Sequence, residues 1–387
     1  MSLVRFAIVF SIISVIVTGS SYLLLKKRLN LGESGNNFLF WFHAIATVLM
    51  ILGPIFFRVY RASVDSTFNF GIQFAQYYLM GWIGVIVIGF GIAEIIHLTV
   101  EKFDPSKRIF LSEGVAKGLL ATISLSSLVG FAQLKLGPKI EKVTIKLPNL
   151  PKTFDGFTIA QLSDVHIGPL LDKEFARKIV DMTMDLKADL IALTGDFVDG
   201  SIEQLQDHVL PLKDLRAEHG VYFITGNHEY YSGADEWMNH FESFGFHVFR
   251  NSNKIIEKTN GNGEKEKFLL AGVFDIQGER FSPDHKTDPF KAAHHPEEVS
   301  CKILLAHNPN TIKQAREAGF HLQLSGHTHA GQFYPFSWIA RMVHQYYEGL
   351  YSVNEKTQIY VNRGTGFWGP PNRLGKTSEI TLITLKS

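Results

Sequence analysis

Cysteine is almost missing from this 387-residue chain, and its scarcity excludes two kinds of site. The single residue, Cys301, rules out an internal disulfide and any metal site built from several thiolates. Net charge is also small, at +1, so no basic surplus indicates nucleic-acid binding. The chain contains no G-x-S-x-G segment, the turn that presents a serine nucleophile in many hydrolases.

The first third of the chain is poor in Asp and Glu, and long apolar runs take their place. A helix needs about 20 apolar residues to cross a bilayer. Four segments reach this length and predict membrane spans at about 4–25, 37–57, 72–98 and 117–134. A signal peptide is the alternative for the first, but Leu25 leads into Lys26-Lys27-Arg28 without a small-residue cleavage pattern. We therefore predict a multi-pass membrane protein with a four-helix transmembrane region over 1–138 and a soluble domain over 139–387.

The side of the membrane on which the soluble domain lies depends on weaker signals. Basic residues are nearly balanced between the two sides, so the positive-inside rule gives almost a tie. The compact cluster Lys26-Lys27-Arg28 after the first span favours an extracytoplasmic soluble domain. We keep that orientation as an expectation.

Beyond Pro138, short apolar runs alternate with helical segments. Helices are predicted from Asp172, which can cap the first, to about Lys187, near 202–215 with Pro211 as an interruption, and near 234–244. Strands are predicted at 142–146, 157–162, 190–193, 221–224, 268–273, 302–305, 322–324, 358–361 and 379–385. This alternation predicts an α/β domain with a mixed sheet toward its end.

Polar residues directly follow five of the predicted strands. The five clusters are Ser163-Asp164-Val165-His166, Gly195-Asp196-Phe197-Val198-Asp199, Gly226-Asn227-His228-Glu229, Ala306-His307-Asn308 and Gly326-His327-Thr328-His329. Because the carboxyl ends of strands in open α/β sheets line one crevice, we expect the clusters to converge. Nitrogen and oxygen ligands without thiolates suit Mn, Fe or Zn in a two-metal site. One cluster alone is weak evidence, but the ordered series predicts a shared metal centre.

This series resembles the calcineurin-like metallophosphoesterase superfamily, whose blocks are Asp-x-His, Gly-Asp-x-x-Asp, Gly-Asn-His-Asp/Glu, a lone His and Gly-His-x-His. All five blocks occur here in order, over about residues 155–330. The runs 326–332 and 362–366 resemble a bacterial membrane-linked branch that includes transmembrane metallophosphoesterases and UDP-2,3-diacylglucosamine pyrophosphatases. Ala330 departs from the Gly usual in that branch, at a position that is not a ligand. The resemblance implies two mixed β-sheets sandwiched between helices.

The resemblance also implies a role for each matching residue. The metal ligands would be Asp164, His166 and His329 for one divalent ion, Asn227, His307 and His327 for the second, and Asp196 for both. His228 would face the leaving group as a catalytic residue, and Asp199 would orient its neighbours by hydrogen bonds. Two such ions clamp a phosphoryl group and lower the pKa of a bridging water, so that hydroxide attacks phosphorus. His228 would then protonate the departing oxygen or stabilise its charge.

Three features leave alternatives open. His285, His294 and His295 compete with His307 for the lone-ligand role, but they lie in a proline-containing loop, so His307 is preferred. Arg363 either grips a substrate phosphate through its bidentate fork or makes a structural salt bridge. The aromatic-rich stretch 333–351 is either a lid that receives an acyl chain or touches the bilayer, or an insertion that packs in the core.

The sequence thus predicts a metal-dependent phosphoric ester hydrolase, anchored in the membrane, that cleaves a phosphoester or pyrophosphate bond. A lipid-linked substrate is favoured; UDP-2,3-diacylglucosamine is one example, and it would require a cytoplasmic catalytic domain. The alternative is a non-catalytic membrane module with a structural metal site. No nucleic-acid partner is expected, because four spans are predicted and the charge shows no basic surplus.

Overall fold

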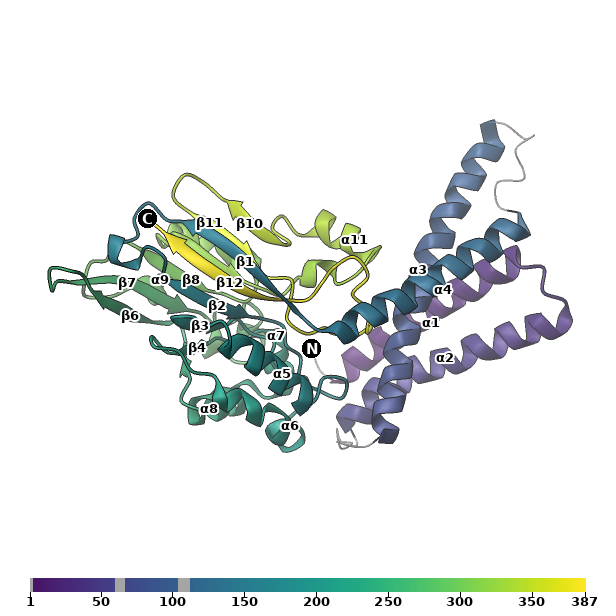
Figure 1. Cartoon of the computed structure of the whole chain (residues 1–387). Helices are drawn as coiled ribbons and strands as arrows, with labels where there is room; N and C mark the ends of the chain where they lie inside the picture. Colours follow the sequence, from purple (N-terminus) through teal and green to yellow (C-terminus); the bar gives the residue numbers. More distant parts are fainter. Residues whose placement is uncertain (1–2, 60–66, 104–111) are drawn as a thin grey trace. The chain divides into compact units, whose positions relative to one another are not determined.

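The computed structural model describes residues 3–59, 67–103 and 112–387, and the chain divides into two compact units. The first unit contains Met1–Lys135 together with Gly369–Gly375. The second contains Leu136–Trp368 together with Lys376–Ser387. Helices build the first unit, whereas the second combines sheets with helices (Figure 1).

Four long helices dominate the first unit. They are α1 (Leu3–Arg28), α2 (Glu33–Val59), α3 (Thr67–Phe103) and α4 (Glu113–Leu136). Each holds a stretch long and apolar enough to cross a membrane: Ile8–Arg28, Glu33–Gly53, Thr67–Thr99 and Glu113–Leu136. Large apolar side chains on them face outward, as lipid contact requires; Leu23 is 65% exposed and Ile95 67%. The prediction of four apolar spans is confirmed.

Polar side chains between these helices pair with one another. The hydroxyl of Ser21 lies 3.0 Å from Nε2 of His43, linking α1 to α2. On α3, Glu94 accepts hydrogen bonds from both Lys27 and Arg28 at the end of α1, and the Arg28 Nε–Glu94 Oε2 distance is 2.8 Å. Such pairs satisfy groups that hydrocarbon cannot, so they hold the helices in register.

A segment from much later in the chain completes the helical unit. The backbone N–H of Arg373 donates to the Gly130 carbonyl of α4 over 3.1 Å, and the N–H of Gly375 donates to Gln133 Oε1 over 3.2 Å. A side chain at Gly130 would collide with Asn372, so the missing Cβ lets the segment approach the helix. Residues 369–375 therefore leave the second unit and return to it after contacting α4.

The second unit contains two six-stranded sheets (Figure 1). In sheet order, the first comprises β1 (Lys139–Lys146), β12 (Glu379–Lys386), β2 (Thr158–Leu162), β3 (Leu190–Leu193), β4 (Val221–Phe223) and β5 (His247–Val248). The second comprises β10 (Gly349–Ser352), β11 (Gln358–Val361), β9 (Leu322–Ser325), β8 (Lys302–Leu305), β7 (Lys265–Gly272) and β6 (Ser252–Thr259). Strands β2 to β5 run parallel, as do β7, β8, β9 and β11, whereas β12 is antiparallel to β2. Both sheets are mixed, as predicted.

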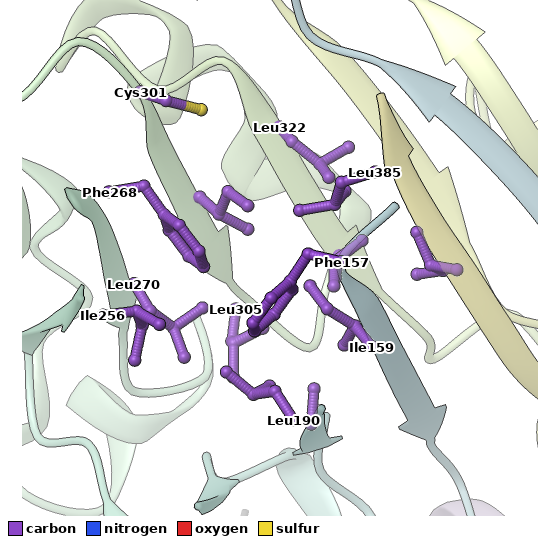
Figure 2. Packing of buried hydrophobic residues seen from close by; sticks show 14 of the residues in the cluster. Phe157, Ile159, Leu190, Ile256, Phe268, Leu270, Cys301, Leu305, Leu322 and Leu385 are labelled. Atoms are coloured by element: carbon purple, nitrogen blue, oxygen red, sulfur yellow. The ribbon is translucent and has the colours of Figure 1, made fainter. Parts of the chain in front are cut away.

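A core of fully buried apolar side chains lies where the sheets face each other (Figure 2). Leu190 lies in the first sheet and Phe157 directly precedes its strand β2, whereas Phe268 and Leu305 lie in the second sheet. Each such side chain contributes roughly 1.5–3 kcal/mol, more than a single loop hydrogen bond at about 1 kcal/mol. The core therefore fixes the strands, and the strands fix where each following loop begins.

Helices alternate with the strands of the second unit (Figure 1). They are α5 (Lys173–Met184), α6 (Ile202–Val209), α7 (Asn227–Ser232), α8 (Ala234–Ser243), α9 (Pro289–Ala293), α10 (Ile312–Glu317) and α11 (Phe336–Val343). Short 3-10 helices occur at Lys152–Phe154, Leu210–Asp214, Gly278–Arg280, Pro283–His285, Pro309–Thr311 and His329–Gly331. Asp172 caps α5 by accepting the N–H groups of Glu174 and Phe175, as predicted. The helix predicted near 202–215 changes to a 3-10 helix at Leu210, because Pro211 cannot continue it.

Candidate metal centre

The five polar clusters meet at one edge of the two sheets. Those after β2, β3 and β4 come from the first sheet, and those after β8 and β9 come from the second. Within these clusters, three groups of side chains could each hold a metal ion, because the ligand atoms of each group lie within 4.8 Å of one another. These groups are Asp164, His166 and His329; Asp196, His307 and His327; and His166, Asp199 and His228.

The first group joins the loop after β2 to the loop after β9. Nε2 of His329 lies 3.2 Å from Oδ1 of Asp164 and 3.1 Å from Nε2 of His166. Two imidazole nitrogens facing each other at this distance, with a carboxylate beside them, are arranged as ligands around a cation. Asp164 is also held in place, because both of its oxygens accept the N–H of His327 at 3.0 Å.

The second group lies beside the first, and its carboxylate Asp196 reaches toward both. Oδ2 of Asp196 is 3.1 Å from Nε2 of His307 and 4.0 Å from Nε2 of His166 in the first group. Nδ1 of His327 lies 3.3 Å from His307 Nε2. The other nitrogen of His307, Nδ1, donates to the Thr194 carbonyl at 2.8 Å, which directs Nε2 toward the centre. The carboxylate of Asp196 thus has both groups within reach.

Asp199 connects two imidazoles through its two oxygens. Its Oδ2 accepts from Nδ1 of His166 at 3.2 Å, which directs the Nε2 lone pair of His166 toward the first group. Its Oδ1 accepts from Nδ1 of His228 at 2.5 Å. Burial acts to lower the pKa of His228, but the charges of Asp199 and Asp196 outweigh it and raise that pKa to about 9. His228 therefore carries a proton near neutral pH and can donate it.

The ligand loops have an unusual backbone. Asp164, His166, Asp196, His327 and His329 all have φ between 50° and 74°, in the left-handed region that costs a non-glycine residue about 1 kcal/mol or more. Neighbouring glycines give these loops room: a Cβ on Gly195 would lie 2.6 Å from the Gly226 nitrogen, so the loops after β3 and β4 touch only because neither carries a side chain there. Such strain persists where surrounding structure enforces it, and it is concentrated here at the convergence point.

Glu229 binds two of the ligand loops together. The fully buried carboxylate accepts N–H groups from Gly226 at 2.6 Å, Asp196 at 2.9 Å and Phe197 at 2.6 Å. Burial, together with the charge of Asp196, raises the pKa of Glu229 to about 7. The acid of the Gly-Asn-His-Glu cluster therefore positions the backbone of both loops.

Negative charge in the centre is balanced by imidazoles. Burial acts to raise the pKa values of Asp164 and Asp196, but nearby histidines outweigh it and hold both well below the usual range. Burial acts to lower the pKa of His307, but the charges of Asp196 and Asp164 outweigh burial and raise that pKa well above its usual value. Protons on His228 and His307 thus compensate the carboxylates, and divalent cations would supply the same compensation while releasing the proton of His307. Burial and the charge of His307 instead lower the pKa of His327 to about 3, so His327 is neutral.

Asn227 tests whether these residues suit a metal ion. Its Oδ1 atom is buried and has no hydrogen-bond partner among the residues that the structure describes. A buried oxygen acceptor without a donor is costly unless a cation or water occupies the space beside it. The donor set, carboxylate, imidazole and amide without thiolate, fits a pair of divalent metals.

The competing residues make other contacts. His285 stacks on Phe274 with ring centroids 4.3 Å apart, and His294 and His295 lie at or just beyond the end of α9; none of the three belongs to the candidate metal groups. The Arg363 guanidinium pairs with Glu141 at 2.7 Å and with buried Glu379 at 2.5 Å. The salt-bridge interpretation of Arg363 therefore describes its contacts, and the phosphate-gripping one has no support here.

One acidic residue near the centre, Asp275, was not predicted from the sequence. Asp275 follows β7, is 2% exposed, and has one oxygen, Oδ2, without a partner in the described part of the chain. Burial is the main cause that raises the pKa of Asp275, to about 6. The strand-end rule that located the other clusters applies equally to Asp275, but its single polar side chain matches no motif.

Two aromatic side chains flank His228, and they also escaped prediction. The ring centroid of Tyr231 lies 5.2 Å from that of His228, and the centroid of Trp368 lies 5.5 Å from it. Both are partly exposed, Tyr231 at 42% and Trp368 at 44%. Gln332 holds Trp368 by two hydrogen bonds to its backbone, at 3.0 Å and 2.9 Å. An open aromatic surface therefore borders the side chain that can donate a proton.

The comparison with known proteins concerns the same part of the chain that forms the candidate metal centre. Residues 157–331 match the family model described as calcineurin-like phosphoesterase. An uncharacterized metallophosphoesterase of Helicobacter pylori (strain ATCC 700392 / 26695) is 31% identical over 386 residues, covering 98% of each chain. An uncharacterized metallophosphoesterase of Bacillus subtilis (strain 168) is 32% identical over 73% of this chain and 98% of its own.

A third relative carries its own membrane description. It is a transmembrane protein with metallophosphoesterase domain from Danio rerio, 35% identical over 69% of this chain. The alignment spans 61% of the length of that relative. Membrane helices and a phosphoesterase domain thus occur together in a protein similar to this one.

Proposed function

Because the chain belongs to the calcineurin-like metallophosphoesterases, we propose that it is a membrane-anchored dinuclear enzyme that hydrolyses a phosphoester or pyrophosphate bond in a lipid-linked substrate. One observation carries the dinuclear proposal: two groups of ligand atoms lie side by side, and Oδ2 of Asp196 in the second group is only 4.0 Å from Nε2 of His166 in the first. The ions would be Mn, Fe or Zn, since the donors are oxygen and nitrogen.

Each candidate ligand has a proposed role. The first ion would be held by Asp164, His166 and His329, the second by Asn227, His307 and His327, and both by Asp196. When bound, a pair of divalent ions lowers the pKa of a water molecule and neutralises charge on phosphoryl oxygens. The hydrogen bonds of His166 and His307 to Asp199 and to the Thr194 carbonyl keep their Nε2 atoms directed inward.

His228 would act on the leaving group. Asp199 binds Nδ1 of His228, so the proton available for transfer is on Nε2. The pKa of about 9 keeps that proton in place at neutral pH, and the departing oxygen would take it as the bond breaks. Asp199 stays ionised, because His166 and His228 hold its pKa low against the effect of burial.

The lipid-linked substrate is supported by the surface around His228. A leaving group bonded to the departing oxygen would lie against Tyr231 and Trp368, and the exposed ring of Phe281 is 5.8 Å from Tyr231. Aromatic surface of this kind binds an apolar or ring-containing group better than a small hydrated one. A nucleotide-linked diacyl sugar such as UDP-2,3-diacylglucosamine combines both features.

We propose an extracytoplasmic catalytic domain on the basis of the Lys26-Lys27-Arg28 cluster. UDP-2,3-diacylglucosamine would require the cytoplasmic orientation, so the side of the membrane decides between substrates. Labelling of an introduced exposed cysteine, Lys258→Cys, by a membrane-impermeant maleimide in intact cells measures it. Labelling before lysis agrees with the proposed orientation, and labelling only after lysis contradicts it.

The central experiment is hydrolysis of bis-p-nitrophenyl phosphate by the purified full-length chain with Mn²⁺. We expect activity that a chelator removes and that Asp196→Asn lowers by roughly 10³-fold, because both ions lose a shared ligand. Asp284→Asn, which neutralises an exposed acid, is the matched control and should retain full activity. Metal binding without hydrolysis of any phosphoester would instead support the non-catalytic module.

A panel of phospholipids and nucleotide-linked lipids then tests the substrate class. Trp368→Ala should raise KM for the preferred lipid several-fold, roughly 10-fold, while hydrolysis of bis-p-nitrophenyl phosphate stays within about twofold. Equal effects on both substrates would mean that the aromatic surface does not determine substrate specificity.

A further inference from the structure

The helix that follows the last ligand loop exposes a continuous apolar face. On α11, Trp338 is 58% exposed, Ile339 42%, Met342 79% and Val343 72%. At about 100° per residue these four side chains occupy an arc of about 140°, which is one face of the helix. We call these four residues the α11 face. A cluster of large exposed apolar side chains marks a surface that binds another protein, a ligand or a membrane.

The other side of α11 is anchored beside the metal centre. Ser337 is buried, and its hydroxyl donates to the Ala330 carbonyl at 2.8 Å, one residue after the candidate ligand His329. Phe336 contacts Phe333 with ring centroids 5.0 Å apart. The start of the helix is therefore fixed to the ligand loop, and the N–H of His344 closes its last turn by donating to the Ala340 carbonyl at 2.8 Å.

Covalent connections keep this unit close to a bilayer. Helix α4, which is long and apolar enough to span, ends at Leu136, and β1 begins at Lys139, so only Gly137 and Pro138 separate them. The second connection is Gly369–Gly375, which belongs to the helical unit. The extended length of a two-residue linker is only about 7 Å, so the domain cannot move far from the membrane surface.

The second connection leads directly to the segments that flank α11. Lys376, the first residue after it, forms an ion pair with Glu348 at 2.5 Å. Its ammonium group lies 5.8 Å from the ring centroid of Tyr334 and 5.3 Å from that of Tyr347. Tyr334 precedes α11 and Tyr347 follows it. Lys376 thus contacts residues on both sides of α11, and in the chain it directly follows the segment Gly369–Gly375.

We propose that the α11 face inserts into the lipid–water interface of the bilayer that α1 to α4 span. Tryptophan prefers that interface, and short amphipathic helices with aromatic and aliphatic residues on one face lie in its plane. The exposed Arg341 flanks the face, where its charged end can reach the lipid phosphates. This inference concerns where the domain binds, and it holds whether or not the metal centre hydrolyses the substrate proposed above.

The test places a fluorescent probe on the face in the full-length chain. In a Cys301→Ala background, Met342→Cys is labelled with bimane and the protein is reconstituted into phosphatidylcholine–phosphatidylglycerol vesicles, with or without brominated phosphatidylcholine. Insertion predicts that brominated lipid lowers bimane emission at position 342 by about twofold or more. The control is Lys258→Cys on the exposed part of β6, where emission should not change. Equal emission at position 342 with both lipids would overturn the proposal.

Two further measurements keep other occupants distinguishable. A second copy on the α11 face would shield the probe from brominated lipid and allow disulfide cross-links between Met342→Cys chains, and this outcome would overturn the proposal. Adding Trp338→Asp to the labelled chain should reduce quenching, because a charged side chain at the face opposes insertion. Quenching that persists unchanged in that variant, with the thermal midpoint also unchanged, would likewise exclude the face as the inserting surface.

Discussion

The two sheets contribute different chemistry to the metal centre. Loops of the first sheet supply the carboxylates Asp164, Asp196 and Asp199, whereas the candidate ligands after β8 and β9 of the second sheet are imidazoles: His307, His327 and His329. One half is therefore anionic, and the other is neutral once its protons leave. Cations between them would satisfy the first half electrostatically and the second by coordination. Metal binding should accordingly add a link between two sheets that already share an apolar core and hydrogen bonds such as that of His307 to the Thr194 carbonyl.

The largest expected effect comes from removing a donor from each half in turn. Asp164→Asn should lower kcat by roughly 10³-fold at any Mn²⁺ concentration, because the anionic half loses charge. His327→Ala removes a neutral donor, so we expect a smaller loss, roughly 10²-fold, that raised Mn²⁺ partly restores. Titration of activity against Mn²⁺ measures both. If the two variants recovered equally, the difference between the halves would have no functional meaning.

The next effect concerns His228, which belongs to the anionic sheet but is not a proposed ligand. His228→Ala should lower kcat by about 10²-fold or more for a substrate with a poor leaving group. The loss should be smaller for p-nitrophenyl esters, whose leaving group departs without a proton. Metal content, measured in parallel, should stay unchanged. A variant that lost metal as well would indicate a ligand or positioning role instead.

Metal removal should lower the free energy of unfolding, because bound ions connect loops of the two sheets. At a free metal concentration about 100 times Kd, binding to the folded state contributes about 2.7 kcal/mol. We expect a chelator to lower the thermal midpoint of the second unit by roughly 5–10 °C, since about 1 kcal/mol shifts a domain of this size by 2–4 °C. Differential scanning calorimetry of the full chain checks this. An unchanged midpoint would mean that metal binding contributes nothing to the stability of the second unit.

The smallest effect tests a residue outside the centre. Arg363→Ala leaves the buried Glu379 without its guanidinium partner, and we expect the unfolding free energy to fall by about 1–3 kcal/mol. The values of kcat and KM should remain within about twofold. A rise in KM with unchanged stability would restore Arg363 as a phosphate-binding residue.

Predictability from the sequence follows the range of the interactions involved. Asp164, Asp196 and His307 could be placed at one edge because each directly follows an apolar strand, and strand ends converge by the rules of α/β sheets. The Asp172 cap and the interruption at Pro211 are likewise local. Such features are encoded within a few residues, so a single sequence contains them.

Features that depend on distant partners could not be predicted. Trp368 lies 140 positions beyond His228, and nothing in its Gly- and Pro-rich surroundings indicates that the two rings meet. The packing of residues 369–375 on α4 could not be predicted either, because it depends on the missing Cβ of Gly130, which is distant in the sequence. Strands β6 and β10 also escaped, since their residues are largely half-exposed and lack a continuous apolar run.

Metal stoichiometry is the most direct test of a shared centre between the two sheets. The full-length chain, reconstituted with Mn²⁺ and freed of excess metal, should contain about two ions per chain by mass spectrometry of the metal content. The Asp196→Asn variant should retain fewer than one, and Asp284→Asn should retain both. At most one ion in the unmodified chain, or full retention in Asp196→Asn, would contradict a pair of ions joined by that carboxylate.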